Sequence, residues 1–272
     1  MILLRWLVFI VAALILNFPV ISTLITSLKS DAEITANASL VIEHPTLVNY
    51  AHIFAIADRF DILHYLSNSV IEAAIGSALS ILLALPAAYA TIRFSVGEKW
   101  LLPIVTNLRA IPLIIFSIPI YLIYQAAHLL DTRFGLALIL CVVNLPLVLV
   151  LLANSIRDIP AELDEAARID GAPTWGILVY VILPLLGPII AASLVLSFIY
   201  SWNEFLFGLM LTTSAAVPVT VGASFFFAAS GGGVQWGVAA AVMIVSALPP
   251  LLLGMAAYQH IGRSMTAGAV KG

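Results

Sequence analysis

Charged side chains are scarce in this 272-residue chain, making up 9% of it against 62% for hydrophobic residues. Soluble domains carry about 25% charged and about 45–50% apolar residues. A chain of this composition cannot cover its surface with polar groups in water, so we expect a lipid bilayer to be its solvent. The net charge of −3 gives no indication of a nucleic-acid partner.

Cysteine is almost absent, since Cys141 is the only one and lies in an apolar run. One cysteine allows neither an intrachain disulfide nor a cysteine-based metal site. The five histidines lie away from the centres of the apolar runs, and no convergent Ser/His/Asp set falls within them. We therefore predict no metal site and no catalytic residue, which argues against a membrane-embedded enzyme.

Lysine occurs only at positions 29, 99 and 271, where it follows leucine, glutamate and valine. A nucleotide-binding P-loop requires the sequence Gly-Lys-Ser/Thr. We therefore expect that this chain contains no ATPase site of its own.

Apolar runs are abundant by contrast, and several are long enough to cross a membrane. A helix needs roughly 20 apolar residues to span about 30 Å of hydrocarbon. The sequence therefore predicts an all-α membrane protein with six transmembrane helices, forming a single transmembrane domain over residues 1–272. The six runs are 6–28, 67–92, 101–126, 135–156, 185–211 and 237–259.

Lysine and arginine predict the sidedness of these spans, because they favour cytoplasmic loops. With a cytoplasmic N-terminus, seven lie inside and three outside. Those inside are Arg5, Arg93, Lys99, Arg157, Arg168, Arg263 and Lys271; those outside are Lys29, Arg59 and Arg133. Both termini, the loop 157–184 and the tail 260–272 are then cytoplasmic, and the segment 29–66 is extracytoplasmic. Arg109 either lies roughly 12 Å deep or reaches the interface from a helix lying along it.

The loop 157–184 is polar and carries the signals of a short helix. Pro160 suits a first helical turn, and Gly171 can adopt a left-handed C-terminal cap. These signals predict a helix over 161–170 and a second helical stretch over about 174–181. Four acids stand against Arg168 in this helix, namely Glu162, Asp164, Glu165 and Asp170. An anionic membrane surface would repel them, so docking on a protein is favoured over resting on headgroups.

Two groups of residues resemble those of a known family. The first is Glu165-Ala166-Ala167, Gly171 and Val181-x-Leu183-Pro184. It resembles the EAA loop of ABC-importer permeases, in which Glu-Ala-Ala, three residues, Gly, nine residues and Ile-x-Leu-Pro follow one another; Val181 replaces the isoleucine. The second group resembles the carbohydrate type, as in maltose-type permeases. It comprises the stretch 159–165, the motif Trp202-Asn203-Glu204-Phe205 and the ending 268–272.

The resemblance implies a permease subunit of an ATP-driven, binding-protein-dependent importer, for a sugar or related polyhydroxyl solute, in a bacterial inner membrane. The implied partners are a second related permease, two ATPase subunits that use ATP and Mg, an extracytoplasmic solute-binding protein and the lipid bilayer. The helix in the loop 157–184 would be the coupling helix between spans four and five. Its expected ATPase-docking residues are Glu162, Glu165, Ala166, Ala167, Asp170, Gly171, Leu183 and Pro184.

Charges within a span are costly and mark functional candidates. In the fifth run, Trp202, Asn203 and Glu204 combine an aromatic ring, an amide and a carboxylate, which suit a polyhydroxyl ligand, so we place a candidate translocation pathway there. Equally, Asn203 and Glu204 would serve to join helices. Glu72, near the outer end of the second run, is expected to reach the headgroups.

An alternative function is an ion-coupled secondary transporter of a small polar solute. Such proteins place ionisable groups of discontinuous helices at the bilayer midplane. Glu204 is the one residue in the six runs that approaches this arrangement, so the importer is the preferred hypothesis. The sequence leaves the identity of the solute open.

Overall fold

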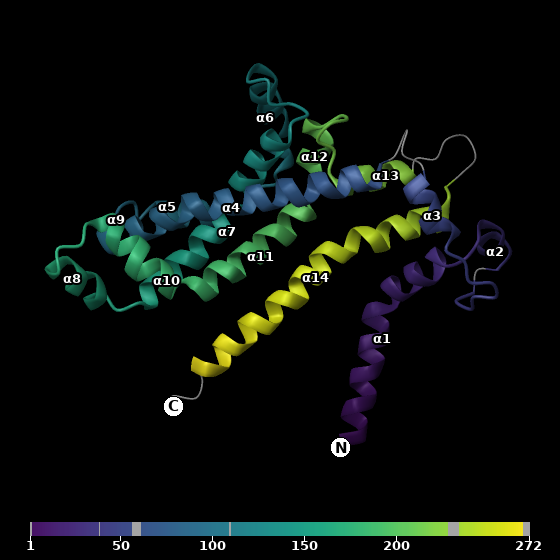
Figure 1. Cartoon of the computed structure of the whole chain (residues 1–272), viewed down its shortest axis with the longest axis horizontal. Helices are drawn as coiled ribbons and strands as arrows, with labels where there is room; N and C mark the ends of the chain where they lie inside the picture. Colours follow the sequence, from purple (N-terminus) through teal and green to yellow (C-terminus); the bar gives the residue numbers. More distant parts are fainter. Residues whose placement is uncertain (1, 38, 56–60, 109, 228–233, 269–272) are drawn as a thin grey trace. The chain divides into compact units, whose positions relative to one another are not determined.

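The computed structural model describes residues 2–37, 39–55, 61–108, 110–227 and 234–268. Within these residues all regular secondary structure is helical and there is no strand, which confirms the predicted all-α class (Figure 1). The helices are α1 (Ile2–Ser27), α2 (Asp31–Ala36), α3 (Val48–Ala55), α4 (Ile62–Phe94), α5 (Leu101–Leu108), α6 (Ile114–Ala126), α7 (Arg133–Asp158), α8 (Glu162–Ile169), α9 (Thr174–Ile177), α10 (Leu183–Leu185), α11 (Gly187–Trp202), α12 (Leu206–Leu211), α13 (Val219–Phe227) and α14 (Trp236–Gly268). A π-helical turn, Leu178–Ile182, joins α9 to α10.

Four of the described helices are long and apolar enough to cross a membrane, namely α1, α4, α7 and α14. A fifth candidate arises if Thr174–Leu185 and α11 form one span, which is bent by 78°. The structure therefore bears out the multi-pass character of the chain, whereas six continuous spans are not observed among the described residues.

Two of the predicted spans are broken. The run 101–126 is divided into α5 and α6, with Pro112 between them, because proline lacks an N–H and disfavours helix in the residue before it. Arg109 lies outside the described residues. The run 185–211 ends its main helix at Trp202 and resumes at Leu206.

The chain divides into two compact units, Met1–Leu66 with Val219–Leu248, and Ser67–Pro218 with Pro249–Gly272. In the first unit, the buried Asn49 donates through Nδ2 to the carbonyl oxygens of Ser27 (2.9 Å) and Lys29 (2.7 Å). The Glu33 carboxylate accepts from the amide of Glu43 (2.8 Å), which lowers the pKa of Glu33. These bonds organise the polar segment that follows α1.

The core of the second unit lies beneath α8. It is formed by the last turns of α4, the second half of α7, and α9 with the π-helical turn that follows it. These elements contribute Ala84, Ala88, Val148, Leu152, Ile156, Ile177, Leu178 and Ile182. Ile159, Ala167 and Ala172, from α8 and its two flanks, pack against this core. The core therefore fixes the position of the loop 157–184.

Helices α4 and α7 approach closely at Gly76. A Cβ atom on Gly76 would lie 2.9 Å from Cβ of Leu140 and 3.0 Å from the carbonyl oxygen of Ala137. One turn further along α4, Ser80 donates to the carbonyl oxygen of Cys141 (3.1 Å). Small residues allow such contact between membrane helices, which associate by close packing and hydrogen bonds.

We predict that Gly76→Leu separates these helices and destabilises the protein by about 1–3 kcal/mol, the usual cost of overpacking. Thermal unfolding of the detergent-solubilised protein would show a lower midpoint. Ala78→Leu is the matched control, because Ala78 lies on the same helix and is exposed. Equal midpoints for the two variants would contradict the close approach.

Candidate functional site

The helix predicted over 161–170 is present as α8, and its end has the expected geometry. Gly171 adopts a left-handed conformation with φ of +84°, and the amide of Ala172 donates to the carbonyl oxygen of Ala167 (2.9 Å). A Cβ atom on Gly171 would meet no atom of the chain within 4 Å. The backbone angle therefore explains the glycine within the folded chain, and the space beside it remains open.

Helix α8 has two different faces. Its outer face consists of the exposed residues Glu162, Glu165, Ala166 and Ile169, the last of which is 87% exposed. The half-buried Ala167 belongs to the inner face and packs on the core. The two alanines of the motif, which the sequence groups together, therefore lie on different faces of α8.

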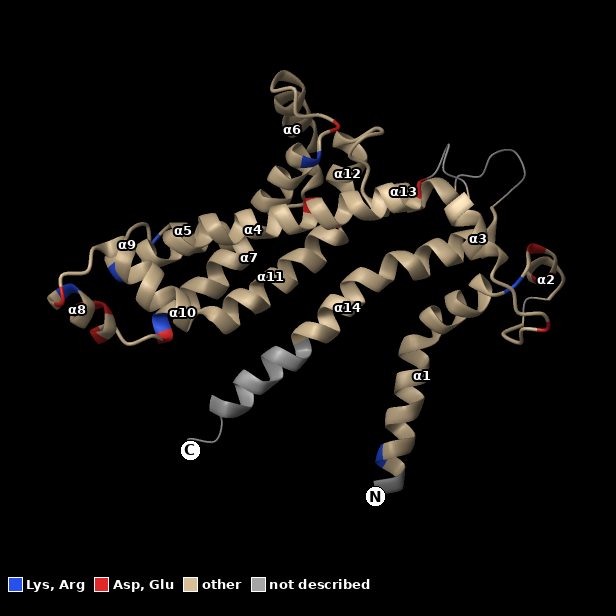
Figure 2. Ribbon diagram, viewed as in Figure 1, with Lys and Arg blue, Asp and Glu red and all other residues tan. Residues whose placement is uncertain are grey.

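The remaining expected docking residues follow α8 in the sequence. Asp170 and Gly171 are exposed at its C-terminal end. Leu183, half-buried, and Pro184, exposed, lie in α10, beyond the π-helical turn. Figure 2 marks acidic and basic residues together at α8 and its flanks, whereas the long helices carry few.

Asp164 corrects the charge argument made from the sequence. Its side chain is buried, with 2% of the residue exposed. Oδ1 accepts from the Tyr89 hydroxyl (2.6 Å) and Oδ2 from Nε of Arg93 (2.9 Å). Asp164 therefore offers no charge to a partner, and the exposed acids within residues 162–170 number three rather than four, namely Glu162, Glu165 and Asp170.

The pathway residues predicted at the end of α11 are engaged with their own chain. Trp202 is 3% exposed and stacks on Phe198 with ring centroids 5.7 Å apart. Asn203 is exposed and donates through Nδ2 to the carbonyl oxygen of Ile199 (2.7 Å). The Glu204 carboxylate accepts from the amides of Phe207 (3.0 Å) and Gly208 (3.2 Å), so it caps α12 where helices leave amides unpaired.

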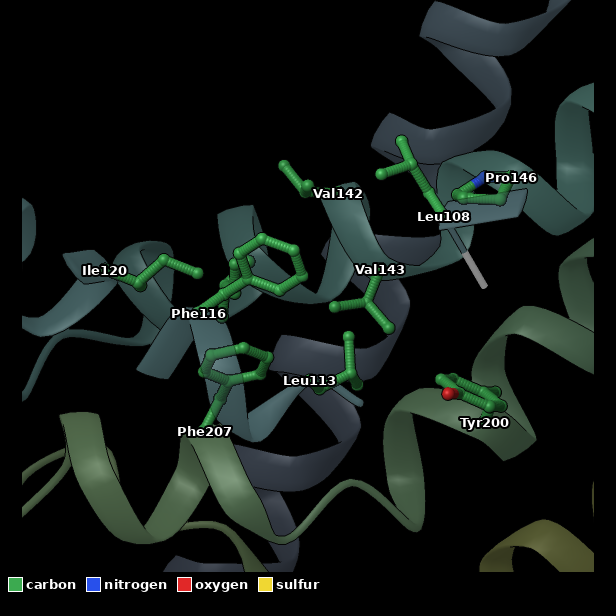
Figure 3. A pocket seen from close by; sticks show the side chains of 10 residues that line it. Leu108, Leu113, Phe116, Ile120, Val142, Val143, Pro146, Tyr200 and Phe207 are labelled. Atoms are coloured by element: carbon green, nitrogen blue, oxygen red, sulfur yellow. The ribbon is translucent and has the colours of Figure 1, made fainter. Parts of the chain in front are cut away.

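An apolar cavity of about 350 Å³ lies beside this turn (Figure 3). It is lined by Leu108, Leu113, Phe116, Ile120, Ile139, Val142, Val143, Pro146, Tyr200 and Phe207. Tyr200 and Phe207 flank the predicted pathway residues in sequence, whereas Trp202, Asn203 and Glu204 are not among the lining residues. Among the described residues of the lining, only Tyr200 carries a polar side-chain group, its hydroxyl.

Comparison with known proteins decides the family. Residues 76–267 match the family described as "Binding-protein-dependent transport system inner membrane component". The chain belongs to this family. It is 32% identical to the sulfoquinovosyl glycerol transport system permease protein SmoH of Agrobacterium fabrum, over 94% of this chain and 89% of that protein. It is also 32% identical to the trehalose/maltose transport system permease protein MalG of Thermococcus litoralis, over 97% of this chain and 94% of that protein.

A solved structure shares the fold of this family member. It is the crystal structure of a bacterial ABC transporter involved in the import of the acidic polysaccharide alginate. The match has a TM-score of 0.77 at 21% identity and covers 94% of this chain and 95% of that chain. The likeness supports the permease fold.

A second polar cluster, which the sequence did not predict, fastens the segment that follows α12. Asp131, in the turn between α6 and α7, accepts from the amides of four consecutive residues, Thr213, Ser214, Ala215 and Ala216, at 3.0–3.2 Å. Burial raises the pKa of Asp131, but these four N–H groups outweigh it and hold the pKa well below its usual range. The carboxylate is therefore ionised and fixes this segment.

Helix α4 contributes to the same fastening through Asn68. Its Nδ2 donates to the carbonyl oxygens of Ala215 (3.1 Å) and Val217 (3.0 Å), and its Oδ1 accepts from Nε of Arg133 (2.7 Å). We call Asn68, Asp131, Arg133 and the segment 213–217 the latch. Glu72, one turn beyond Asn68, is 1% exposed, so the expectation that it reaches the headgroups is wrong; helix packing encloses it instead.

We predict that Asp131→Asn destabilises the protein by about 2 kcal/mol at neutral pH, because hydrogen bonds to a charged group are lost. A carboxyl whose pKa is lowered by folding stabilises the protein above its unfolded pKa of about 4, and this contribution disappears as the pH falls towards the folded pKa. Thermal unfolding in detergent should therefore give unfolding midpoints for wild type and variant that differ at pH 7 and converge as the pH is lowered.

The exposed Asp158 provides the matched control for this measurement. Asp158→Asn should leave the unfolding midpoint at pH 7 unchanged. A constant difference between wild type and Asp131→Asn at every pH would contradict the assigned role of the Asp131 charge.

Proposed function

We propose that this chain is the transmembrane permease subunit of an ATP-driven importer for a sugar or a related polyhydroxyl solute. The observation that carries the proposal is the outer face of α8, exposed, acidic and ended by a left-handed Gly171, at the positions of the EAA pattern. The names of the relatives, which transport trehalose, maltose and sulfoquinovosyl glycerol, support the sugar class.

The proposed topology has six crossings in a bacterial inner membrane, with both termini and α8 in the cytoplasm and a single permease domain. Helices α5 and α6 form the third crossing, and α11 with α12 the fifth. Broken helices are tolerated at membrane depth where protein encloses them. In support, the Glu204 carboxylate pairs with the amides at the start of α12.

The proposed complex contains a second related permease, two ATPase subunits and an extracytoplasmic binding protein. The ATPase subunits use ATP and Mg, and this chain supplies the coupling helix. Ile169, 87% exposed, and the small Ala166 beside it allow close approach by another protein. Glu162, Glu165 and Asp170 give this surface a negative charge that suits a basic cleft, and Leu183 and Pro184 of the EAA pattern follow in α10.

A crosslinking experiment tests the docking surface. We predict that a photo-crosslinker placed at Ala166, which is exposed, captures an ATPase subunit in cells expressing the whole transporter. The same crosslinker at Ala167, which packs inward on the core, should give little intermolecular product. Capture of lipid alone from position 166 would contradict the proposal.

A glycine substitution tests the contact with the partner. We predict that Gly171→Asp reaches the membrane yet loses at least about tenfold in uptake and ATPase co-purification, because it places a charged side chain in the contact. Gly171→Asn is the control for backbone conformation, since asparagine also tolerates the left-handed region. It should retain more activity, because it adds no charge. Wild-type co-purification of Gly171→Asp would count against the docking role.

Glu204 offers a test of the pathway. Removing its cap by Glu204→Ala should destabilise α12 by about 1 kcal/mol, seen as a lower thermal midpoint. If the residue also contacts solute, Glu204→Gln should reduce the apparent affinity for solute in uptake assays more than it reduces the midpoint. A lower midpoint with unchanged affinity would assign Glu204 a structural role alone.

A further inference from the structure

The end of α4 and the coupling helix α8 are joined by a buried pair of opposite charges. Arg93 lies in the last turn of α4, and its Nε is 2.9 Å from Oδ2 of Asp164. The two side chains are 8% and 3% exposed. Tyr89, one turn before Arg93 and on the same face of α4, donates its hydroxyl to the other oxygen of Asp164. We call these three residues the clamp.

The clamp holds more than one point of the loop. Nη2 of Arg93 donates to the carbonyl oxygen of Ile159 (2.8 Å), so one guanidinium binds both α8 and the residue that follows α7. One turn further along α8, the guanidinium carbon of Arg168 lies 5.3 Å from the centre of the Phe94 ring. Tyr89 meets the same ring edge-on. Several directional contacts thus prevent α8 from rotating or sliding against α4.

A buried ion pair is a costly way to join two helices if stability alone is required. Apolar residues of similar volume often do as well or better, whereas removal of one charged partner is strongly destabilising. The geometry of the clamp is therefore its distinguishing property. The clamp holds α8 in one orientation relative to α4, so a force on the outer face of α8 acts on α4 as well.

Helix α4 connects this clamp to the latch. It is continuous from Ile62 to Phe94, and the segment from Asn68 to Phe94 is roughly 39 Å long at 1.5 Å per residue. Asn68 at one end binds the segment after α12, and Arg93 at the other end binds α8. A displacement of α8 is therefore passed along one helix to the far end of the second unit.

We propose that the clamp is the joint through which movement of the coupling helix reaches α4, and through α4 the latch. Tyr89, Arg93 and Asp164 act as positioning residues for transport, and they touch neither solute nor nucleotide. The proposal rests on the proposed importer function, and it adds which helix of this chain receives the motion.

The test uses the complete transporter in proteoliposomes with its binding protein, and compares three quantities: ATPase co-purification, ATP hydrolysis and solute uptake. Asp164→Asn should retain the ATPase subunits and basal hydrolysis, while solute transported per ATP falls at least about tenfold, since the charged pair is lost. Tyr89→Phe keeps the ring on Phe94 and removes one hydroxyl, so the same ratio should fall about fivefold.

The matched control is Glu98→Gln. Glu98 follows α4 directly and pairs with Arg157 at 3.8 Å, but both side chains are about half exposed, and exposed pairs contribute little. Its solute-to-ATP ratio should equal that of wild type. Arg93→Asp combined with Asp164→Arg should recover part of the ratio lost in the single variants.

The outcomes separate the two proposals. A wild-type ratio in both Tyr89→Phe and Asp164→Asn would overturn the clamp as a joint. Loss of the ATPase subunits from these variants, in step with uptake, would also overturn it, because the clamp would then only shape the docking surface. If Asp164→Asn fails to reach the membrane, Tyr89→Phe decides. Failure of the wild-type chain to retain any ATPase subunit would instead overturn the proposed function.

Discussion

The pairing of the Asp164 carboxylate with Tyr89 and Arg93 is the interaction on which the orientation of α8 in the loop 157–184 depends. A helix of eight residues is too short to be stable by itself in water, and α8 (Glu162–Ile169) is no longer than that. Its stability must come from its neighbours: Ala167 packs on the core, and the contacts of Asp164 with Tyr89 and Arg93 set the orientation of the helix. With the inner face packed on the core, the outer face is left polar and exposed.

The bilayer imposes the second constraint, since every backbone group at membrane depth needs a partner. The chain meets this constraint at the end of α11 with side chains. Glu204 pairs with the amides that begin α12, and Asn203 with a carbonyl oxygen of α11. The motif Trp202-Asn203-Glu204 thus allows a helix to break, which gives these residues a structural reason to be polar beside any contact with solute.

Local signals in the sequence were sufficient for some of these features. Pro160 and Gly171 predicted the bounds of α8 to within a residue or two, because caps act through neighbouring backbone atoms. Long apolar runs predicted α1, α4, α7 and α14. The break before α6 could have been predicted from Pro112. The break at Glu204 could not be predicted from hydropathy, because the residues on both sides of it are apolar.

The remaining features depend on residues far apart in the chain. Asp164 looked like one more acid of an exposed helix, because its partner Arg93 lies 71 positions away. Nothing near Asp131 indicates that it binds the amides of 213–216, since an aspartate in a turn is common for local reasons. The prediction for Glu72 was wrong for the same reason. Its position along an apolar run can be read from the sequence, but its burial by other helices cannot.

The chemistry beside the pathway motif bears on where solute specificity resides. A polyhydroxyl solute is distinguished by several hydrogen bonds to correctly placed groups. The residues that the structure describes around the cavity offer one polar side-chain group, the Tyr200 hydroxyl, among apolar walls. The nearby Asn203 and Glu204 already bind backbone groups of α11 and α12. We therefore expect this chain to contribute shape and movement to the pathway, and the other subunits of the importer to contribute most of the recognition of the solute.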